Sequence, residues 1–401
     1  MLRDGLNLLD GNWYAGDPHA IWSELRAEAP VFYDPASAVW GISRYQDILA
    51  IERDPETFSS RTAPRPHGQS LPMMISMDDP AHQRRRSLVN RGFTPKRVSD
   101  REGELGDICR LIIDDICERG ACDFVWDVAA RLPLMVIAGM LGLDEMQEEL
   151  LRWSEELMRP TPAEPDLVAM QVAQKAIEEF RESQLKVIAD RRRHPRQDLM
   201  TILCEAEIDG ERLDDESIVQ ETLLILIGGD ETTRHVISGG MLALLGEPEQ
   251  LAALQDGSAD LALAVEEMIR WTSPIQNMAR TATRDLEFQG QALREGDQVI
   301  LFYPSANRDE SVFADPQRFD IHRRPNPHIA FGFGRHFCLG ASLARLELNV
   351  VFRELFRRLP DIHLASEEPL PRRASNFVSG LEAMPIEFTP TTRRSTEGSA
   401  T

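Results

Sequence analysis

Apolar residues recur three and four positions apart along most of the chain, a spacing that gathers them on one face of a helix. This pattern predicts helices over residues 18–29, 98–119, 132–143, 144–159, 166–193, 214–245 and 258–272. Shorter runs rich in β-branched and aromatic residues predict strands at 31–33, 39–42, 286–288, 298–301 and 385–388. We therefore expect a mainly α fold with a small β region gathered from both ends of the chain. A single domain over residues 1–390 would be followed by a disordered tail at 391–401, where residues are small and polar.

The composition limits the kind of protein. The 401 residues are 42% hydrophobic, enough for one large core. The apolar run at 132–143 is too short to span a bilayer, and the N-terminus lacks the pattern of a signal peptide. The five cysteines form no C-x-x-C pair, which argues against disulfides and zinc and for a reducing cytoplasm. A net charge of −22 disfavours nucleic acids and anionic membranes as partners. We expect the protein to be cytoplasmic and to be a monomer.

One cysteine, Cys338, lies among glycines and aromatic residues in the stretch FGFGRHFCLG at 331–340. Glycine is costly inside a helix or strand, but it suits a tight turn that aims backbone N–H groups at a sulfur atom. A thiolate ligand on haem iron favours O–O cleavage, so the stretch predicts a haem-thiolate site that activates dioxygen. The alternative is a buried structural cysteine beside a glycine-rich turn. The complete pattern F-x-x-G-x-x-x-C-x-G, followed by a helical sequence from 341, favours the ligand.

A second unusual stretch is the long apolar helix at 222–235, which contains Gly228, Gly229 and the acid–alcohol pair Glu231 and Thr232. Each glycine costs a helix about 1 kcal/mol relative to alanine. Local violations of this kind tend to occur at functional sites. A helix that opens at these glycines would leave room for dioxygen beside a carboxyl and a hydroxyl group. The alternative is an ordinary buried helix whose polar residues make an i, i+4 or capping contact.

These two stretches, together with Glu267 and Arg270 on one helix face, resemble the cytochrome P450 family. The resemblance implies the cytochrome P450 fold, with haem b buried between the long central helix and the cysteine loop. It implies that Cys338 is the iron ligand and that Glu231 and Thr232 are catalytic residues that deliver protons for dioxygen activation. The family usually has Ala-Gly where this chain has two glycines, which suggests a looser kink.

The resemblance also assigns residues around the haem. Arg323 would join Glu267 and Arg270 in a buried structural network, from which the loss of one partner would cost about 3–5 kcal/mol. Arginine and histidine suit the two haem carboxylates through charge-assisted hydrogen bonds. Besides Cys338, the haem contacts implied in this way are His82, Arg86, Arg280, His336, Phe331 and Gly228.

Substrate recognition is expected from three stretches, at 71–77, 223–229 and 376–381, with a flexible lid around 158–170. The candidate substrate-binding residues are Met73, Met74, Ile75, Leu226 and Val378. Methionine-rich linings adapt to bulky apolar ligands, but a core uses the same residue types, so composition does not separate the two. By resemblance, these stretches and the block 221–235 are similar to actinobacterial cytochromes P450 that oxidise the side chain of cholesterol and cholest-4-en-3-one. This resemblance implies hydroxylation of the terminal C26 methyl and further oxidation to the acid, in sterol catabolism.

The family resemblance further implies that electrons pass from NAD(P)H through a reductase and a ferredoxin. Between residues 81 and 99 the chain carries six Arg or Lys residues and no acid. A basic patch on an acidic protein would attract an acidic ferredoxin, so we expect docking near Arg84, Arg85 and Lys96. The alternative is that these cations are solvated.

Two other functions stay open. One is a cytochrome P450 monooxygenase of another bulky apolar substrate, such as a macrolide, a terpenoid or a fatty acid. The other is a non-enzymatic haem-thiolate sensor, against which the acid–alcohol pair argues, because a sensor needs no proton delivery.

Overall fold

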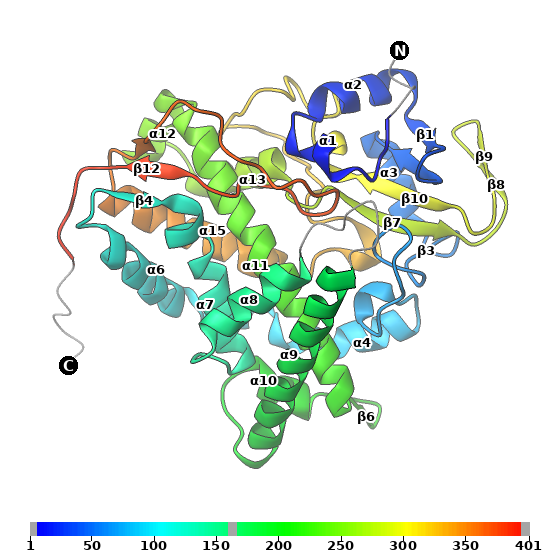
Figure 1. Cartoon of the computed structure of the whole chain (residues 1–401), viewed down its shortest axis with the longest axis horizontal. Helices are drawn as coiled ribbons and strands as arrows, with labels where there is room; N and C mark the ends of the chain where they lie inside the picture. Colours follow the sequence, from blue (N-terminus) through cyan, green and yellow to red (C-terminus); the bar gives the residue numbers. More distant parts are fainter. Residues whose placement is uncertain (1–5, 159–166, 394–401) are drawn as a thin grey trace.

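The computed structural model describes residues 6–158 and 167–393, and helices make up most of this part of the chain (Figure 1). The prediction of a mainly α fold is confirmed. The helices are α1 (Gly11–Ala15), α2 (His19–Glu28), α3 (Tyr45–Arg53), α4 (Ala81–Val89), α5 (Pro95–Ser99), α6 (Glu102–Ile116), α7 (Arg131–Leu141), α8 (Gln147–Leu157), α9 (Leu167–Arg193), α10 (Leu199–Glu205), α11 (Asp215–Leu245), α12 (Pro248–Gln255), α13 (Leu261–Thr272), α14 (Tyr303–Ala306) and α15 (Ala341–Arg358).

The strands form small sheets. They are β1 (Val31–Asp34), β2 (Val39–Ile42), β3 (Phe58–Ser59), β4 (Ala121–Asp123), β5 (Glu207–Ile208), β6 (Glu211–Arg212), β7 (Asn277–Ala282), β8 (Leu286–Phe288), β9 (Gln291–Leu293), β10 (Gln298–Phe302), β11 (His363–Leu364) and β12 (Pro385–Glu387). The largest sheet has the order β1-β2-β10-β7-β3, with β10 parallel to β2 and the other pairs antiparallel. β12 pairs with β4 and β11 in a separate three-stranded sheet, so the small β region is divided among several sheets. β4 and β11 are too short to show a pattern in the sequence.

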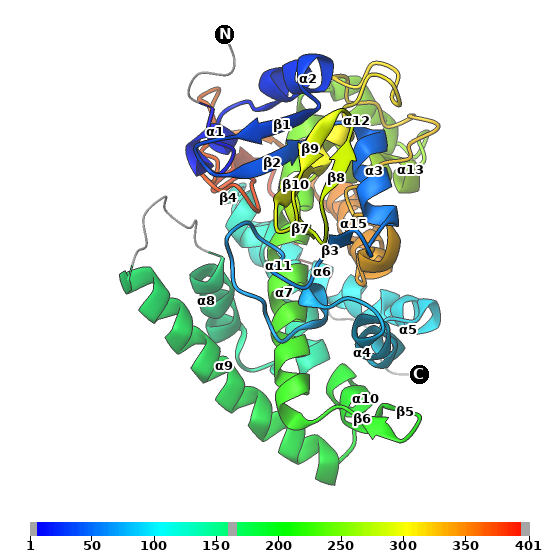
Figure 2. The same ribbon diagram turned by 90° about the vertical axis from the view of Figure 1, so that its right-hand side faces the viewer.

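The long helix α11 runs through the middle of the molecule in both views (Figures 1 and 2). Asp214 caps its first turn by accepting a hydrogen bond of 2.7 Å from the N–H of Ser217. α7 and α13 pack along it, and α15 packs against it and against α6. Most residues on α11 are buried, because helices surround it on several sides. This helix therefore carries its polar residues into the interior of the fold.

One predicted helix is divided in the structure, and other helices were not predicted. The predicted helix at 98–119 is two helices, since α5 ends at Ser99 and α6 begins at Glu102. The intervening turn is closed by a hydrogen bond from the N–H of Arg101 to the carbonyl oxygen of Val98, which stops α5, and α6 then starts with acidic residues in its first turn. α3 was missed, although it contacts the loop that contains Cys338.

Parts of two predictions fall outside the described residues. These are residues 394–401 of the predicted tail and residues 159–166 of the predicted lid. Over the ranges that are described, no helix combines the length and apolar character needed to cross a membrane.

Candidate functional site

Cys338 lies at the end of a tight loop that leads into α15. The N–H of Cys338 donates a hydrogen bond of 2.9 Å to the carbonyl oxygen of Phe331, which closes the loop. Gly332 and Gly334 have φ angles of +67° and +69°, a conformation that glycine adopts without strain. A side-chain carbon at Gly334 would also lie 2.6 Å from the carbonyl oxygen of Glu52 on α3. Two glycines are therefore required by the shape of this loop.

The sulfur of Cys338 is held by backbone donors. The N–H groups of Gly340 and Ala341 hydrogen-bond to it, and they lower the pKa of the thiol together with the nearby cations Arg86 and Arg345. Desolvation by the surrounding protein is the larger effect and raises that pKa. The side chain nevertheless keeps an exposed surface. The sequence predicted N–H groups aimed at this sulfur, and the structure has them.

The middle of α11 has an open position at Gly228, and its neighbours on the helix are buried or half-buried. Gly228 is exposed, and a side-chain carbon built on it would meet no atom within 4 Å. One turn later, Thr232 Oγ1 donates a hydrogen bond of 2.8 Å to the carbonyl oxygen of Gly228. α11 is helical without interruption, so the helix does not break at the two glycines. The open space lies at Gly228 alone, because a side-chain carbon at Gly229 would lie 2.7 Å from Ile137 Cδ1.

Glu231, the acid beside Thr232, is fully buried and bound by two arginines. Arg234 Nη2 donates to Glu231 Oε1 at 2.8 Å, and Arg373 Nη1 donates to the same oxygen at 2.5 Å from 142 positions further along the chain. Burial outweighs these cations and raises the pKa of Glu231 to about 7. A carboxyl group with this pKa can both give and take a proton near neutral pH.

Four of the predicted haem contacts come together beside the cysteine loop. The rings of His82 and His336 have centroids 4.2 Å apart, and Arg86 Nη2 donates to the carbonyl oxygen of Phe337. Desolvation, and then the charges of Arg280, His82 and Arg86, lower the pKa of His336 to about 2. His82 Nε2 is buried and has no hydrogen-bond partner in the described chain. Since the two imidazoles are neutral, the positive charge of this site comes from Arg86 and Arg280, and it favours a negatively charged ligand.

The three residues of the predicted structural network are bound to one another. Arg270 donates to the fully buried carboxylate of Glu267 through Nε and Nη2, both at 2.7 Å. Arg323 Nε donates to the two oxygens of Glu267 at 3.2 and 3.1 Å. Arg270 Nη1 also reaches the carbonyl oxygens of Asn307 and Pro316 at 2.8 and 3.1 Å. The network therefore ties α13 to the chain that precedes the cysteine loop.

The predicted substrate-binding residues lie mostly in the interior. Met73, Met74, Leu226 and Val378 are buried, and Ile75 is half-buried. Leu226 is 0% exposed and, like Met73 and Met74, belongs to the main core.

Ile225 lies in the predicted stretch 223–229 but was not among the named candidates, and it is half-buried on α11. It precedes Gly228 by three positions and Thr232 by seven, so all three lie on the same helix face. This helical spacing is visible in the sequence and could have placed Ile225 among the candidates.

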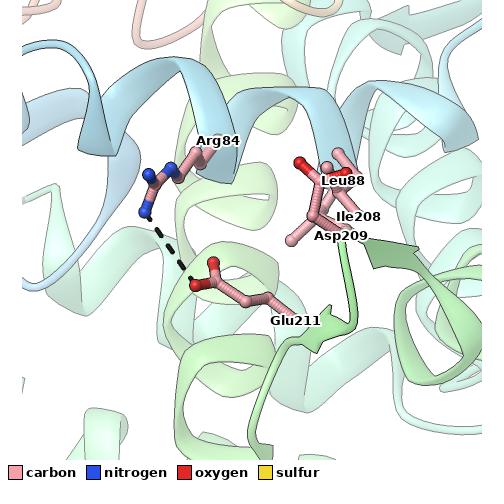
Figure 3. A pocket seen from close by; sticks show the side chains of 5 residues that line it. All are labelled: Arg84, Leu88, Ile208, Asp209 and Glu211. Atoms are coloured by element: carbon pink, nitrogen blue, oxygen red, sulfur yellow. Dashed lines mark ion pairs between the residues drawn. The ribbon is translucent and has the colours of Figure 1, made fainter.

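The cations predicted to dock a ferredoxin differ in their surroundings. Arg84 Nη1 lies 3.9 Å from Glu211 Oε1, and both side chains are exposed. The pocket between them is lined by Arg84, Leu88, Ile208, Asp209 and Glu211 (Figure 3). Arg85 Nη1 lies 3.4 Å from Oε1 of Glu221, a fully buried carboxylate of α11. Lys96 on α5 is exposed.

Comparison with known families identifies this arrangement. Residues 142–258 and 261–381 match the family model described as Cytochrome P450. The chain belongs to the cytochrome P450 family.

Haem b is the cofactor of cytochromes P450, and the residues of this chain fit it. The free surface of the Cys338 sulfur offers a ligand to the iron. The unpaired Nε2 of His82 and the guanidinium groups of Arg86 and Arg280 can bind the haem carboxylates. The bare backbone at Gly228 leaves room beside α11.

Known cytochromes P450 resemble this one along nearly all of its length. A protein of Mycobacterium tuberculosis named steroid C26-monooxygenase is 48% identical over 96% of this chain and 97% of its own. A methyl-branched lipid omega-hydroxylase of Mycobacterium bovis is 38% identical over 92% of this chain and 90% of its own. Among solved structures, a cytochrome P450 of Chondromyces apiculatus superposes with a TM-score of 0.89 at 33% identity, covering 98% of this chain and 100% of its own. A cytochrome P450 of Bacillus megaterium in complex with corticosterone has a TM-score of 0.86 at 32% identity, covering 93% and 98%.

Proposed function

We propose that this cytochrome P450 hydroxylates the terminal C26 methyl of the side chain of cholest-4-en-3-one or cholesterol and oxidises it further to the carboxylic acid. The observation that carries the proposal is the 48% identity, over almost the whole chain, to a protein named steroid C26-monooxygenase. Each hydroxylation inserts one oxygen atom of dioxygen into a C–H bond and releases the other as water, using two electrons and two protons.

The haem supplies the chemistry that activates dioxygen, and this chain supplies the ligand, the room and the protons. Cys338 would hold the iron, with the N–H groups of Gly340 and Ala341 stabilising its thiolate. Thr232 would hand on a proton from its hydroxyl group, which lies in the opening beside Gly228. Glu231 would supply that proton from the interior, since a pKa of about 7 lets it alternate between two protonation states.

The substrate would bind against the Met73–Ile75 segment, the open face of α11 and the segment around Val378. Half-buried Ile225 and Ile75 offer apolar surface, and methionine side chains adapt to a bulky ligand. We propose these as the substrate-binding residues, with Ile225 in place of Leu226.

Electrons would come from NAD(P)H through a reductase and a ferredoxin that docks near Arg84 and Lys96. Both side chains are exposed, whereas the charge of Arg85 faces the buried Glu221. Reversing the charge with Arg84→Glu and Lys96→Glu should raise the KM for ferredoxin several-fold at low salt and less at high salt. An unchanged KM at low salt would remove these residues from the docking surface.

Optical titration of the ferric enzyme with cholest-4-en-3-one, followed by mass spectrometry of the products, tests the proposed substrate. A saturable low-spin to high-spin shift and a C26-hydroxylated product are expected. A second candidate, terminal hydroxylation of methyl-branched lipids, is favoured by the 38% identity to a methyl-branched lipid omega-hydroxylase. Turnover of a methyl-branched fatty acid without any response to sterol would select this second function.

A further inference from the structure

Glu221 is a buried carboxylate that neither the haem site nor the proposed proton delivery uses. It lies near the start of α11 and is 0% exposed. Its Oε1 accepts a hydrogen bond of 2.9 Å from the backbone N–H of Met74, which is 147 positions earlier in the chain. Arg85 of α4 reaches the same oxygen with Nη1 at 3.4 Å. Three separate parts of the chain therefore meet at one carboxylate.

The segment that contacts Glu221 is fastened at both ends. At one end the N–H of His67 donates to Gln298 Oε1 at 2.9 Å, and at the other Asp78 Oδ1 accepts from the N–H of Ser60 at 2.9 Å. Residues 67–72 between these points are exposed. The hydrogen bond from Met74 to Glu221 ties the middle of the segment to α11.

This hydrogen bond also sets where two methionines lie. Met73 and Met74 are 4% and 6% exposed, and Ile75 packs against the main core. The N–H of Met74 opens the 3₁₀ turn Met74–Ser76, which the N–H of Met77 closes onto the carbonyl oxygen of Met74 at 3.2 Å. A shift of the Met74 backbone would therefore move the whole turn.

The charge at Glu221 is only partly compensated. Its Oε2 is buried without a hydrogen-bond partner in the part of the chain described. Burial raises the pKa of Glu221 to about 7, although Arg85 from α4 and the Met74 N–H, the groups that face it, both lower that pKa. Burying an incompletely paired acid costs folding free energy that an apolar residue of the same size would not cost, so its presence points to a role that only an acid can fill.

We propose that Glu221 is a positioning residue for substrate binding, which together with Arg85 fastens the Met73–Ile75 segment to α11 in the conformation that receives the sterol. We call Glu221, Arg85 and the Met74 N–H the Glu221 clasp. The inference deepens the proposed function and rests on it as far as the ligand is concerned. It also gives Arg85 an internal role in place of the ferredoxin docking expected from the sequence.

The test compares two substitutions at Glu221 in the haem-loaded enzyme. Glu221→Leu removes both contacts with a side chain of similar size, whereas Glu221→Gln keeps an acceptor for the Met74 N–H and loses the charge opposite Arg85. The readouts are hydrogen–deuterium exchange at residues 71–77 without ligand, and the Kd for cholest-4-en-3-one from optical titration. Glu221→Leu should speed exchange at 71–77 and raise the Kd about tenfold, which corresponds to about 1.4 kcal/mol. Glu221→Gln should have a smaller effect on both.

Two arginine variants complete the design. Arg85→Met should raise the Kd about threefold, between wild type and Glu221→Leu, and leave the KM for ferredoxin unchanged. The matched control is Arg91→Met, which removes the same charge from an exposed arginine just beyond α4 that bonds to the carbonyl oxygen of Glu207. It should change neither exchange at 71–77 nor the Kd.

Wild-type exchange at 71–77 in Glu221→Leu would overturn the proposal. If that variant does not fold, wild-type exchange and Kd in both Glu221→Gln and Arg85→Met would overturn it instead. A higher ferredoxin KM for Arg85→Met with unchanged exchange would return Arg85 to the docking surface. If wild-type enzyme binds no sterol, the proposed function fails, while exchange at 71–77 still tests the Glu221 clasp.

Discussion

Removing Arg373 should destabilise the enzyme at pH 8 more than at pH 6. Arg373 Nη1 donates to Glu231 Oε1 at 2.5 Å, and Glu231 is fully buried. Because the pKa of Glu231 is raised to about 7, the carboxyl is mostly protonated at pH 6 and mostly ionised at pH 8. In Arg373→Met we expect that pKa to rise further, so that the carboxyl stays protonated over this pH range, since one of the two cations that favour the ionised form is gone.

The size of the effect follows from proton linkage. At pH 8, one pH unit above its pKa of about 7, ionisation of Glu231 raises the unfolding free energy of the wild-type protein by about 1.4 kcal/mol. The variant lacks this stabilisation, because its carboxyl stays protonated. At pH 6 the same contribution is close to zero. The variant should therefore lose about 1.4 kcal/mol more unfolding free energy, relative to wild type, at pH 8 than at pH 6. Loss of the contacts of Arg373 with Glu382 and Glu155 adds a cost that is equal at both pH values.

Urea unfolding followed by circular dichroism at the two pH values measures this difference. Arg372→Met is the matched control, because it removes the neighbouring cation, which does not contact Glu231. In a Glu231→Gln background the pH-dependent part of the Arg373→Met effect should disappear. Equal destabilisation at pH 6 and pH 8 would refute the reasoning, because Glu231 would then not change its protonation in this range.

Three further predictions test other parts of the site. Thr232→Ala should keep consuming oxygen but convert most of it to peroxide instead of product, so the ratio of product to NAD(P)H oxidised should fall. The control Thr233→Ala should keep the wild-type ratio. A wild-type ratio in Thr232→Ala would exclude Thr232 from proton delivery. Arg323→Met should lower the unfolding free energy by about 3–5 kcal/mol, because it leaves part of the buried Glu267 charge unpaired, and retention of wild-type stability would show that Arg270 alone compensates that charge. Burial and, after it, the charge of Asp230 raise the pKa of Glu347 to about 8. Between about pH 4.5 and pH 8 the unfolded state has lost the proton that the folded state keeps, so the unfolding free energy should fall as the pH rises through this range. Glu347→Gln should remove this fall, so its melting temperature should exceed that of wild type by more at pH 8 than at pH 5, and parallel curves would contradict it.

The cysteine loop and the Glu267 network could be predicted because their residues are close together or follow a family pattern. Glycines at 332 and 334 are typical of a tight turn, and Glu267 and Arg270 are three positions apart on one helix. The helical spacing that relates Arg234 to Glu231 could likewise be seen in the sequence. Pairs of this kind depend only on the local geometry of a turn or a helix, so the spacing of the residues in the sequence is enough to predict them.

Contacts between distant segments could not be predicted. No pattern connects Arg373 with Glu231, or Arg85 with Glu221, because such pairs depend on how α4, α11 and the C-terminal segment pack. The run of cations between residues 81 and 99 predicted one basic surface, but a helix distributes consecutive side chains around its axis. Arg85 thus points to the interior while Arg84 remains outside.

The order of strands in the largest sheet has a consequence for how the protein is made. β1 and β2 form a hairpin near the N-terminus, and β10, which pairs with β2, ends at Phe302. A two-stranded hairpin is at best marginally stable alone. A ribosome adding about 5–20 residues per second needs about 13–52 s for the roughly 260 residues between Ile42 and Phe302. During that time the apolar side chains of Val39 and Ile42, both 0% exposed in the folded protein, lack the neighbours that β10 supplies, and such exposed apolar surface is what chaperones protect.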